Sequence, residues 1–192
     1  KKLELIMEHR VGKLLIAHPT LPENSPFSKT VIYVYQENPL TGAVGIVLNK
    51  PGNKSIQQLC YEHNVHDYPH MQPKIHYGGP VNPGAMVMLH TDEWNSQNTA
   101  EAGRNLRISS DRLMLHKIAA GDEPIYWRIC LGICTWQPGQ LDMELKGQFP
   151  YSQHNRWLTA VPDDNIVFVY DQEDQWVAAV DACSQQTIQH FF

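Results

Sequence analysis

The amino-acid sequence predicts an α+β fold built on a mostly antiparallel β-sheet. Apolar, β-branched segments come first, at Lys13–Ala17, Thr30–Tyr35 and Ala43–Leu48, and helical segments are interspersed only later. This order lacks the regular alternation of strand and helix that is typical of a parallel α/β sheet. No repeat, linker or low-complexity segment divides the chain, so we expect residues 1–192 to form a single domain.

The first strands are predicted to form a hairpin. Asn38–Gly42 has the composition of a turn and lies between Thr30–Tyr35 and Ala43–Leu48. Gly45 interrupts the second of these strands. Glycine at such a position is typical of a bulge or of a close approach between two backbones.

The middle of the chain is expected to contain little regular structure. Ser55–His63 is predicted to be a short helix with Ser55 as its N-cap. The stretch Pro69–Pro83 carries prolines at both ends and is predicted to be irregular chain. Ala85–Leu89 has the apolar run of a strand, and the polar Trp94–Arg104 is expected to be an exposed loop.

The second half contains one predicted strand and three predicted helices. Ser110 is a candidate cap for a helix that ends before Gly121. Ile125–Thr135 is long enough for a central strand. Pro138 is expected to lie in the first turn of a short helix, and Asp171 to cap the last one. The side chains expected to face the core from these helices are Leu113, Met114, Ile118, Leu141, Leu145, Trp176, Val180 and Cys183.

Composition and charge argue against several classes of function. The chain has 15 Lys and Arg against 20 Asp and Glu, which gives a net charge of −5. The basic residues are scattered, whereas nucleic-acid binding needs them clustered. No window reaches the ~18 apolar residues of a membrane span. The four cysteines are widely spread, so we expect free thiols and a cytoplasmic protein that contacts neither nucleic acid nor membrane directly.

Three ordered blocks of sequence resemble the bacterial YqgE/AlgH family. The first block comprises Leu14–Pro19 and Gly42–Pro51, the second Tyr77–Val81, and the third Trp136–Leu141. The resemblance extends from about Gly12 to about Val180, which is nearly the whole chain.

This resemblance implies a fold but not a reaction. It implies a bifurcated, mostly antiparallel β-sheet folded into a pseudo-barrel with flanking helices. Family members are often labelled transcriptional regulators, and the resemblance supplies no catalytic residue. Where relatives tend to carry a Glu-His pair after the second strand, this chain has Glu37 and Asn38. A role that needs that histidine is therefore not expected here.

Motifs for catalysis, cofactors and metals are missing from the sequence. It has no G-x-S-x-G, G-x-x-x-x-G-K-[ST], H-E-x-x-H or G-x-G-x-x-G pattern. His63, His66 and His70 could hold zinc on one face of an unbroken helix. Pro69 is expected to end that helix, so no metal or cofactor is predicted.

Glycines and a helix start are the candidate binding features. The backbone of Gly78 and Gly79 can approach a ligand closely, although a tight turn fixed by Pro80 uses the same residues and is the commoner case. Gly139 can open a helix whose free N–H groups would face an anion.

We expect at least two of three segments to lie side by side and to line one concavity, with His90 at its edge. The segments are Asn49–Pro51, Tyr77–Val81 and Gln137–Gln140, which are ends of elements, where scaffolds usually present binding groups. The candidate ligand-binding residues are Asn49, Tyr77, Gly78, Gly79, Pro80, His90, Gly139 and Gln140.

Two functional hypotheses follow. The first is a non-enzymatic protein that binds an unknown protein or small-molecule partner and regulates expression indirectly. The second is a small enzyme or small-ligand binder with its site at the Gly78–Pro80 loop, His90 and Asn49. Direct DNA binding is a third possibility, but the acidic charge and the lack of a helix-turn-helix signature argue against it.

Overall fold

Two halves of one curled β-sheet meet at a shared strand in the computed structural model, which describes residues 9–66, 74–150 and 157–191. The strands are β1 (Leu14–Ala17), β2 (Val31–Asn38), β3 (Gly42–Val47), β4 (Pro51–Ser55), β5 (Lys74–Tyr77), β6 (Val81–Thr91), β7 (Ala100–Glu101), β8 (Leu106–Ser109), β9 (Trp127–Trp136) and β10 (Trp157–Ala160). The helices are α1 (Ile56–Glu62), α2 (Arg112–Ala119), α3 (Gln140–Leu145), α4 (Gln172–Gln189) and the π-helix η1 (Asn165–Val169).

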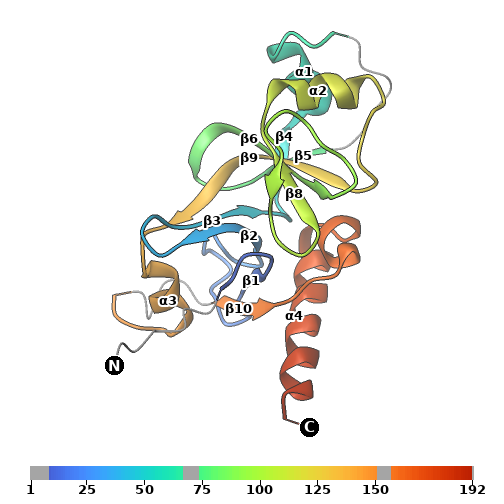
Figure 1. Ribbon diagram of the computed structural model, residues 1–192. Coiled ribbons are helices and arrows are strands. Elements are labelled where there is room, and N and C mark those ends of the chain that lie inside the picture. Colours follow the sequence, from blue (N-terminus) through green and yellow to red (C-terminus); the bar gives the residue numbers. More distant parts are fainter. Residues whose placement is uncertain (1–8, 67–73, 151–156, 192) are drawn as a thin grey trace, which may run out of the picture.

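The shared strand is β9, where the sheet divides. Its C-terminal end is antiparallel to β3, with Gly45 opposite Cys134, and its N-terminal end is antiparallel to β6, with His90 opposite Trp127. β5 lies parallel to β9, with His76 opposite Cys130. One half of the sheet is therefore β10-β1-β2-β3, and the other contains β6, β8 and β7, with β4 and β5 beside them (Figure 1). This arrangement confirms the predicted α+β fold with a bifurcated, mostly antiparallel sheet.

The predicted hairpin is confirmed as β2 and β3. The two strands pair antiparallel from Ile32 opposite Val47 to Asn38 opposite Gly42. Their register shifts beside Gly45, where a Cβ atom would lie 2.8 Å from the Tyr33 carbonyl oxygen. Gly45 thus marks both the irregularity and the close approach that its position in the strand predicted.

The prediction of irregular chain over Pro69–Pro83 is wrong for residues 74–77 and 81–83 and correct for residues 78–80; its first residues lie outside those described. Lys74–Tyr77 is strand β5, and β6 already begins at Val81. Proline is tolerated here because the β6–β9 register skips from Val81 to Met86, so Pro83 lies in a stretch without a paired ladder.

The residue at which each helix begins determines which of its side chains face the core. Ser55 caps α1 in a reciprocal capping box with Gln58, as predicted for this N-cap. In α2 the cap is Asp111 and not Ser110, since the Asp111 carboxylate accepts from the Met114 N–H at 2.9 Å. Met114 and Ile118 are buried as expected, but Leu113 is 46% exposed, which corrects its predicted place in the core.

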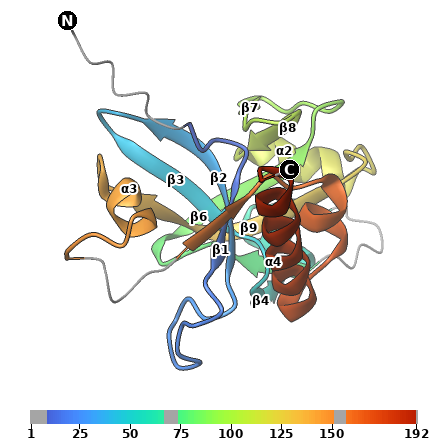
Figure 2. The same cartoon turned by 90° about the horizontal axis from the view of Figure 1, so that it is seen from below.

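The two later helices differ in how well the sequence located them. α3 begins at Gln140 with Gly139 as its cap, so Pro138 precedes the helix and does not occupy its first turn. The cap of α4 is Asp171, as predicted. α4 packs beside β1 and β10 on the outside of the sheet (Figure 2). Among the described residues, no helix combines the length and apolar character needed to cross a membrane.

The core consists of three apolar clusters. One apolar cluster, which includes Leu14, Tyr33 and Leu89, packs beneath α4 and η1. A second fills the space between α1, α2 and the strands of the other half. A third lies near α3 and contains Trp136 and Trp157. The first cluster contains residues from both halves of the sheet, so it fills the space where the two halves face each other.

Candidate functional site

Two of the three predicted binding segments lie side by side. The Tyr77 N–H donates to the Lys50 carbonyl at 2.8 Å, and Pro51 pairs with His76 between β4 and β5. The third segment, Gln137–Gln140, lines a different, very small groove beside the β2–β3 turn. Neither of the first two segments lines that groove.

The glycines of the second segment serve strand packing. The Gly78 N–H donates to Leu131 at 2.7 Å, and the Gly78 carbonyl accepts from the Val47 N–H at 2.8 Å. A Cβ atom on Gly79 would lie 2.3 Å from the Ile133 carbonyl oxygen. A side chain at Gly79 would therefore disturb β9 itself, while Tyr77, at 44% exposed, and Pro80 remain at the surface.

Asn49 is buried and joins two elements of the fold by hydrogen bonds. Its Oδ1 accepts from the Val31 N–H at 2.9 Å, and its Nδ2 donates to the carbonyls of Lys29 and Gln172. The side chain is only 2% exposed. It joins the start of β2 to the start of α4, and these partners occupy its hydrogen-bonding groups.

A second contact, between His76 and Asp171, also joins the sheet to the start of α4. The buried His76 Nε2 lies 3.0 Å from Asp171, the cap of α4, and this contact lowers the pKa of Asp171 against the opposing effect of burial. The His76 Nδ1 has no hydrogen-bond partner among the described residues. The residues that carry the family resemblance around Asn49 and Tyr77 therefore fix α4 on the sheet.

His90 does not border these segments, which corrects the expectation that it lies at their edge. It lies opposite Trp127 at the far end of β9 and is fully buried. Its Nδ1 lies 2.8 Å from the Thr91 carbonyl and its Nε2 lies 2.8 Å from the Ser109 hydroxyl. Because a carbonyl only accepts, we place the ring proton on Nδ1.

The burial of His90 predicts a loss of stability in acid. Burial lowers the pKa of His90 below 6.5, so the unfolded chain takes up the proton first as pH falls. The stabilising contribution is complete above about pH 6.5 and is lost below it, by up to about 1.4 kcal/mol per pH unit. Urea unfolding from pH 5 to 8 should show a shallower acid slope for His90→Gln. Equal slopes in both proteins would contradict this role.

The third block of sequence builds a buried carboxylate centre. Glu144, 2% exposed, accepts from the indole N–H groups of Trp136 at 3.0 Å and Trp157 at 2.9 Å. Its other oxygen accepts from Gln140 Nε2 at 2.8 Å. Gly139 supplies the left-handed backbone, with φ of 77°, that starts this helix. Gly139 and Gln140 thus anchor α3 to the sheet, and sequence reasoning missed Glu144.

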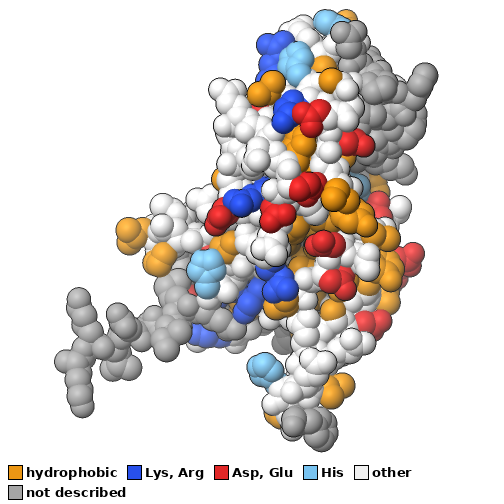
Figure 3. Space-filling view, turned by 45° about the vertical axis from the view of Figure 1, so that its right-hand side comes forward, with side chains coloured by type: hydrophobic (Ala, Val, Ile, Leu, Met, Phe, Trp, Pro, Cys, Tyr) orange, Lys and Arg blue, Asp and Glu red, His pale blue; other side chains and the backbone are white. Residues whose placement is uncertain are grey.

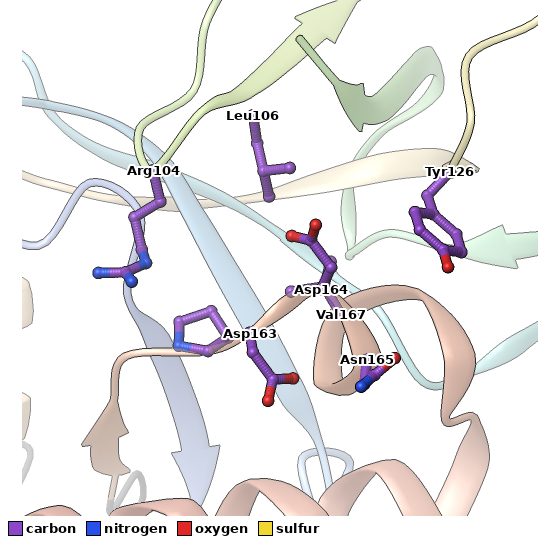
Figure 4. A pocket seen from close by; sticks show the side chains of 8 residues that line it. Arg104, Leu106, Tyr126, Asp163, Asp164, Asn165 and Val167 are labelled. Carbon is purple, nitrogen blue, oxygen red and sulfur yellow. The ribbon is translucent and has the colours of Figure 1, made fainter. Parts of the chain in front are cut away.

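A cavity of about 470 Å³ opens where the two halves of the sheet face each other (Figure 4). One wall comes from the β7–β8 turn, the start of β8 and the residue before β9. The opposite wall comes from the segment that follows β10 and from η1. The lining residues are Arg104, Leu106, Tyr126, Pro162, Asp163, Asp164, Asn165 and Val167.

Charges of opposite sign line this cavity without neutralising each other. Within the described part of the chain, no ion pair joins Arg104 to Asp163 or Asp164. One oxygen of Asp163 accepts from the Ile166 N–H at 2.9 Å, which fixes the first turn of η1. Leu106 and Val167 form an apolar floor, 4% and 1% exposed.

An apolar rim adjoins the cavity. Tyr126 stacks on Phe168 at 5.8 Å between ring centroids. Ile125, Val169 and Tyr170 next to this pair are 73%, 59% and 44% exposed. Figure 3 shows hydrophobic side chains next to acidic ones on the face that carries η1 and α4.

Two buried polar side chains hold the η1 wall in place. Arg128, 7% exposed, donates to the carbonyls of Phe168 and Tyr170, to Leu48 in the sheet and to Gln175 on α4. Burial lowers the pKa of Arg128. Gln175 Nε2 donates to the carbonyls of residues 166 and 167. These side chains donate to carbonyls that the wide π-helical turn directs toward the interior. π-Helical turns are rare in proteins, and those that occur are often found at functional sites.

The other wall is held by Tyr33. Its buried hydroxyl donates to the carbonyls of Ala102 at 2.9 Å and Gly103 at 3.1 Å, at the base of the β7–β8 turn. Burial raises the pKa of Tyr33 well above its usual range, with smaller opposing effects of Arg104 and Asp164. Both charges therefore lie within electrostatic reach of one hydroxyl.

The described residues place no metal site beside this cavity. Within residues 9–66, 74–150 and 157–191, no group of three His, Cys, Asp or Glu side chains is placed to hold a metal ion. His63 ends α1, whereas His70 lies outside the described residues, so the histidine triplet as a whole is not tested.

Comparison with known proteins places the chain in a family. The AlgH-like family model matches residues 14–187. The chain belongs to the AlgH-like family. The UPF0301 protein of Xanthomonas euvesicatoria is 32% identical over 88% of this chain and 86% of its own length. A UPF0301 protein of Methylococcus capsulatus is 31% identical over 88% of both chains.

Solved structures support the AlgH-like fold. The solution structure of AlgH from Pseudomonas aeruginosa is 31% identical and covers 89% of this chain and 87% of its own, with a TM-score of 0.71. A crystal structure of a Corynebacterium diphtheriae protein, 19% identical with a TM-score of 0.65, shares the fold alone over 88% of this chain and 85% of its own. The AlgH-like assignment confirms the resemblance read from the three sequence blocks.

Proposed function

We propose that this AlgH-like protein is a non-enzymatic, cytoplasmic binding protein that regulates expression indirectly, through what binds in the cavity beside η1. The observation that carries this proposal is the cavity itself, whose two walls bear opposite charges that do not pair with each other. Its volume lies within the range of roughly 300–1,000 Å³ that ligand pockets occupy.

The chemistry of the cavity favours binding over catalysis. Among the described residues that line it there is no histidine, cysteine, serine or lysine, so these residues supply neither the usual nucleophiles nor the commonest general base. The thiols of Cys130 and Cys134 are buried, and burial raises the pKa of each to about 12. Neither sulfur is therefore an activated thiolate.

Direct DNA binding has little support. The net charge is −5, and two carboxylates line the cavity next to its one arginine. A regulatory effect would therefore pass through a bound partner or ligand, because polyanion binding depends on clustered positive charge.

The alternative is a small-ligand site or enzyme at the Gly78–Pro80 loop. It has less support, because the N–H and carbonyl of Gly78 are both taken by neighbouring strands and His90 is buried far along β9. The exposed Tyr77 ring is the group through which such a site would act.

A cavity-filling variant tests the proposal. Asn165→Trp places a large ring at the exposed edge of the cavity, and Gln185→Trp places the same ring on an exposed position of α4. Affinity capture from native lysate, with mass spectrometry of proteins and small molecules, should enrich components that Asn165→Trp loses and Gln185→Trp keeps. Identical capture by all three proteins would refute a function at this cavity.

A further inference from the structure

We propose that the cavity beside η1 binds a zwitterion, an α-amino acid or short peptide with both termini free. Arg104 would bind the carboxylate, and Asp163 and Asp164 would bind the ammonium group. This inference deepens the proposed function and rests on it, because it names the class of ligand for the same cavity.

The first step is the separation of charge between the walls. Figure 4 shows Arg104 on the β7–β8 turn and the two aspartates on the opposite wall, ahead of η1. Within the described chain, no ion pair joins Arg104 to either of them. A ligand of one charge would satisfy one wall only, whereas a zwitterion gives each wall a charge-assisted hydrogen bond.

The second step is the backbone that carries Arg104. Arg104 and Asn105 have φ of 52° and 58°, and the Leu106 N–H donates to Gly103, as in a type I′ turn. Asparagine and glycine suit this turn, while arginine is strained in it. The residue whose φ is least suited to the turn is thus one that lines the cavity, and backbone strain of this kind is often found at functional sites.

The third step is the room made for the Arg104 side chain. A Cβ atom on Gly12 would lie 2.8 Å from the Arg104 Cγ, so the bare backbone of Gly12 is what allows the arginine stem to pass. Two chain segments far apart in sequence therefore combine to place one guanidinium. Beyond this contact of its stem, Arg104 is exposed to solvent.

The fourth step is the surface between the charges. Leu106 and Val167 are apolar and almost fully buried, and Pro162 lies beside them. They would contact the body of the ligand between its two charged ends. Tyr126 and Asn165 add polar groups on the same lining. An amino acid or short peptide with an apolar side chain fits this order of charge, apolar surface and charge.

The test is an NMR titration of the isotope-labelled full chain with L-leucine and alanyl-leucine at millimolar concentration. The matched probes are N-acetyl-alanyl-leucine, which lacks the ammonium group, and alanyl-leucine amide, which lacks the carboxylate. We expect saturable shifts of the amides of Leu106, Asn165 and Val167 with at least one free zwitterion. Each capped probe should bind at least about tenfold more weakly, the equivalent of one charge-assisted hydrogen bond.

Two pairs of variants separate binding from folding. Arg104→Gly should weaken binding about tenfold or more while the unfolding midpoint stays equal or rises by up to about 3 °C, because glycine relieves the strained φ. Asn105→Gly relieves the same turn and should leave binding unchanged. Asp164→Asn should weaken binding, and Asp174→Asn, on α4 away from the cavity, should not.

Several outcomes would overturn the zwitterion. If the amide probe binds equally well, the cavity is a cation site, and if the acetylated probe does, it is an anion site. If no probe gives a saturable shift at the cavity, it accepts neither class. In each of these cases, capture that Asn165→Trp abolishes would still support the proposed function, so the two failures are distinguishable.

Discussion

Glu144→Leu is expected to lower the free energy of unfolding by about 3–5 kcal/mol, because two buried indole N–H groups lose their acceptor. Each buried donor left without a partner costs roughly 1–3 kcal/mol. Trp136 and Trp157 both donate to the same Glu144 oxygen, and Gln140 donates to the other. The loss therefore loosens α3, β9 and β10 together.

Urea denaturation followed by tryptophan fluorescence measures this effect. Glu144→Gln keeps an acceptor oxygen and should lose less, about 1–3 kcal/mol. Glu173→Leu is the control, since Glu173 pairs with Lys29 at the surface, with its side chain 62% exposed. That control should change stability by less than about 1 kcal/mol. A Glu144→Leu protein as stable as the control would show that the indoles find other acceptors.

Arg128→Met is expected to cost about 3–5 kcal/mol, comparable to removing one partner of a buried ionic network. The variant removes the donor for Leu48 and Gln175, and for the carbonyls of Phe168 in η1 and Tyr170 just after it. Because η1 supplies part of one wall of the cavity, through Asn165 and Val167, the damage should be concentrated there.

Hydrogen exchange locates the damage. In Arg128→Met, amides of η1 and the start of α4 should lose more protection than those of α2, which packs in the other half of the sheet. Arg107→Met is the matched control, because Arg107 pairs at the surface with Glu101, whose side chain is 84% exposed. Uniform loss of protection across both halves would contradict a local role for Arg128.

Local sequence signals predicted the elements that depend on local physics. The hairpin of β2 and β3 followed from its turn and from the apolar, β-branched residues on either side. The caps Ser55 and Asp171 followed from their hydroxyl and carboxylate side chains. Proline density misled over Lys74–Tyr77, because strand pairing with β4 and β9 outweighed it. Because Ser110 and not Asp111 was predicted as the cap of α2, the predicted helix began one residue too early. Leu113 was therefore wrongly predicted to face the core.

The site was harder to predict than the fold. The blocks that identify the family drew attention to Asn49, Gly78 and Gly79, whose groups are used to join β2, β9 and α4. Arg104 and Asp164 carry no motif and are far apart in sequence. They line one cavity because β8 and the segment after β10 lie on opposite halves of a sheet that divides at β9, and only the complete strand order shows this.

The shared strand β9 limits how the cavity can open. In proteins that close on ligands by hinge bending, two bodies are joined by a few flexible residues. Here the two halves are joined by the hydrogen bonds of β9 to β3, β5 and β6, so hinge motion between them would break the sheet. Admission of a ligand is therefore left to the parts that lie outside the ladder, η1 and the β7–β8 turn. In this protein, opening and closing of the cavity would involve movement of the β7–β8 turn and η1, while the β-sheet keeps its structure.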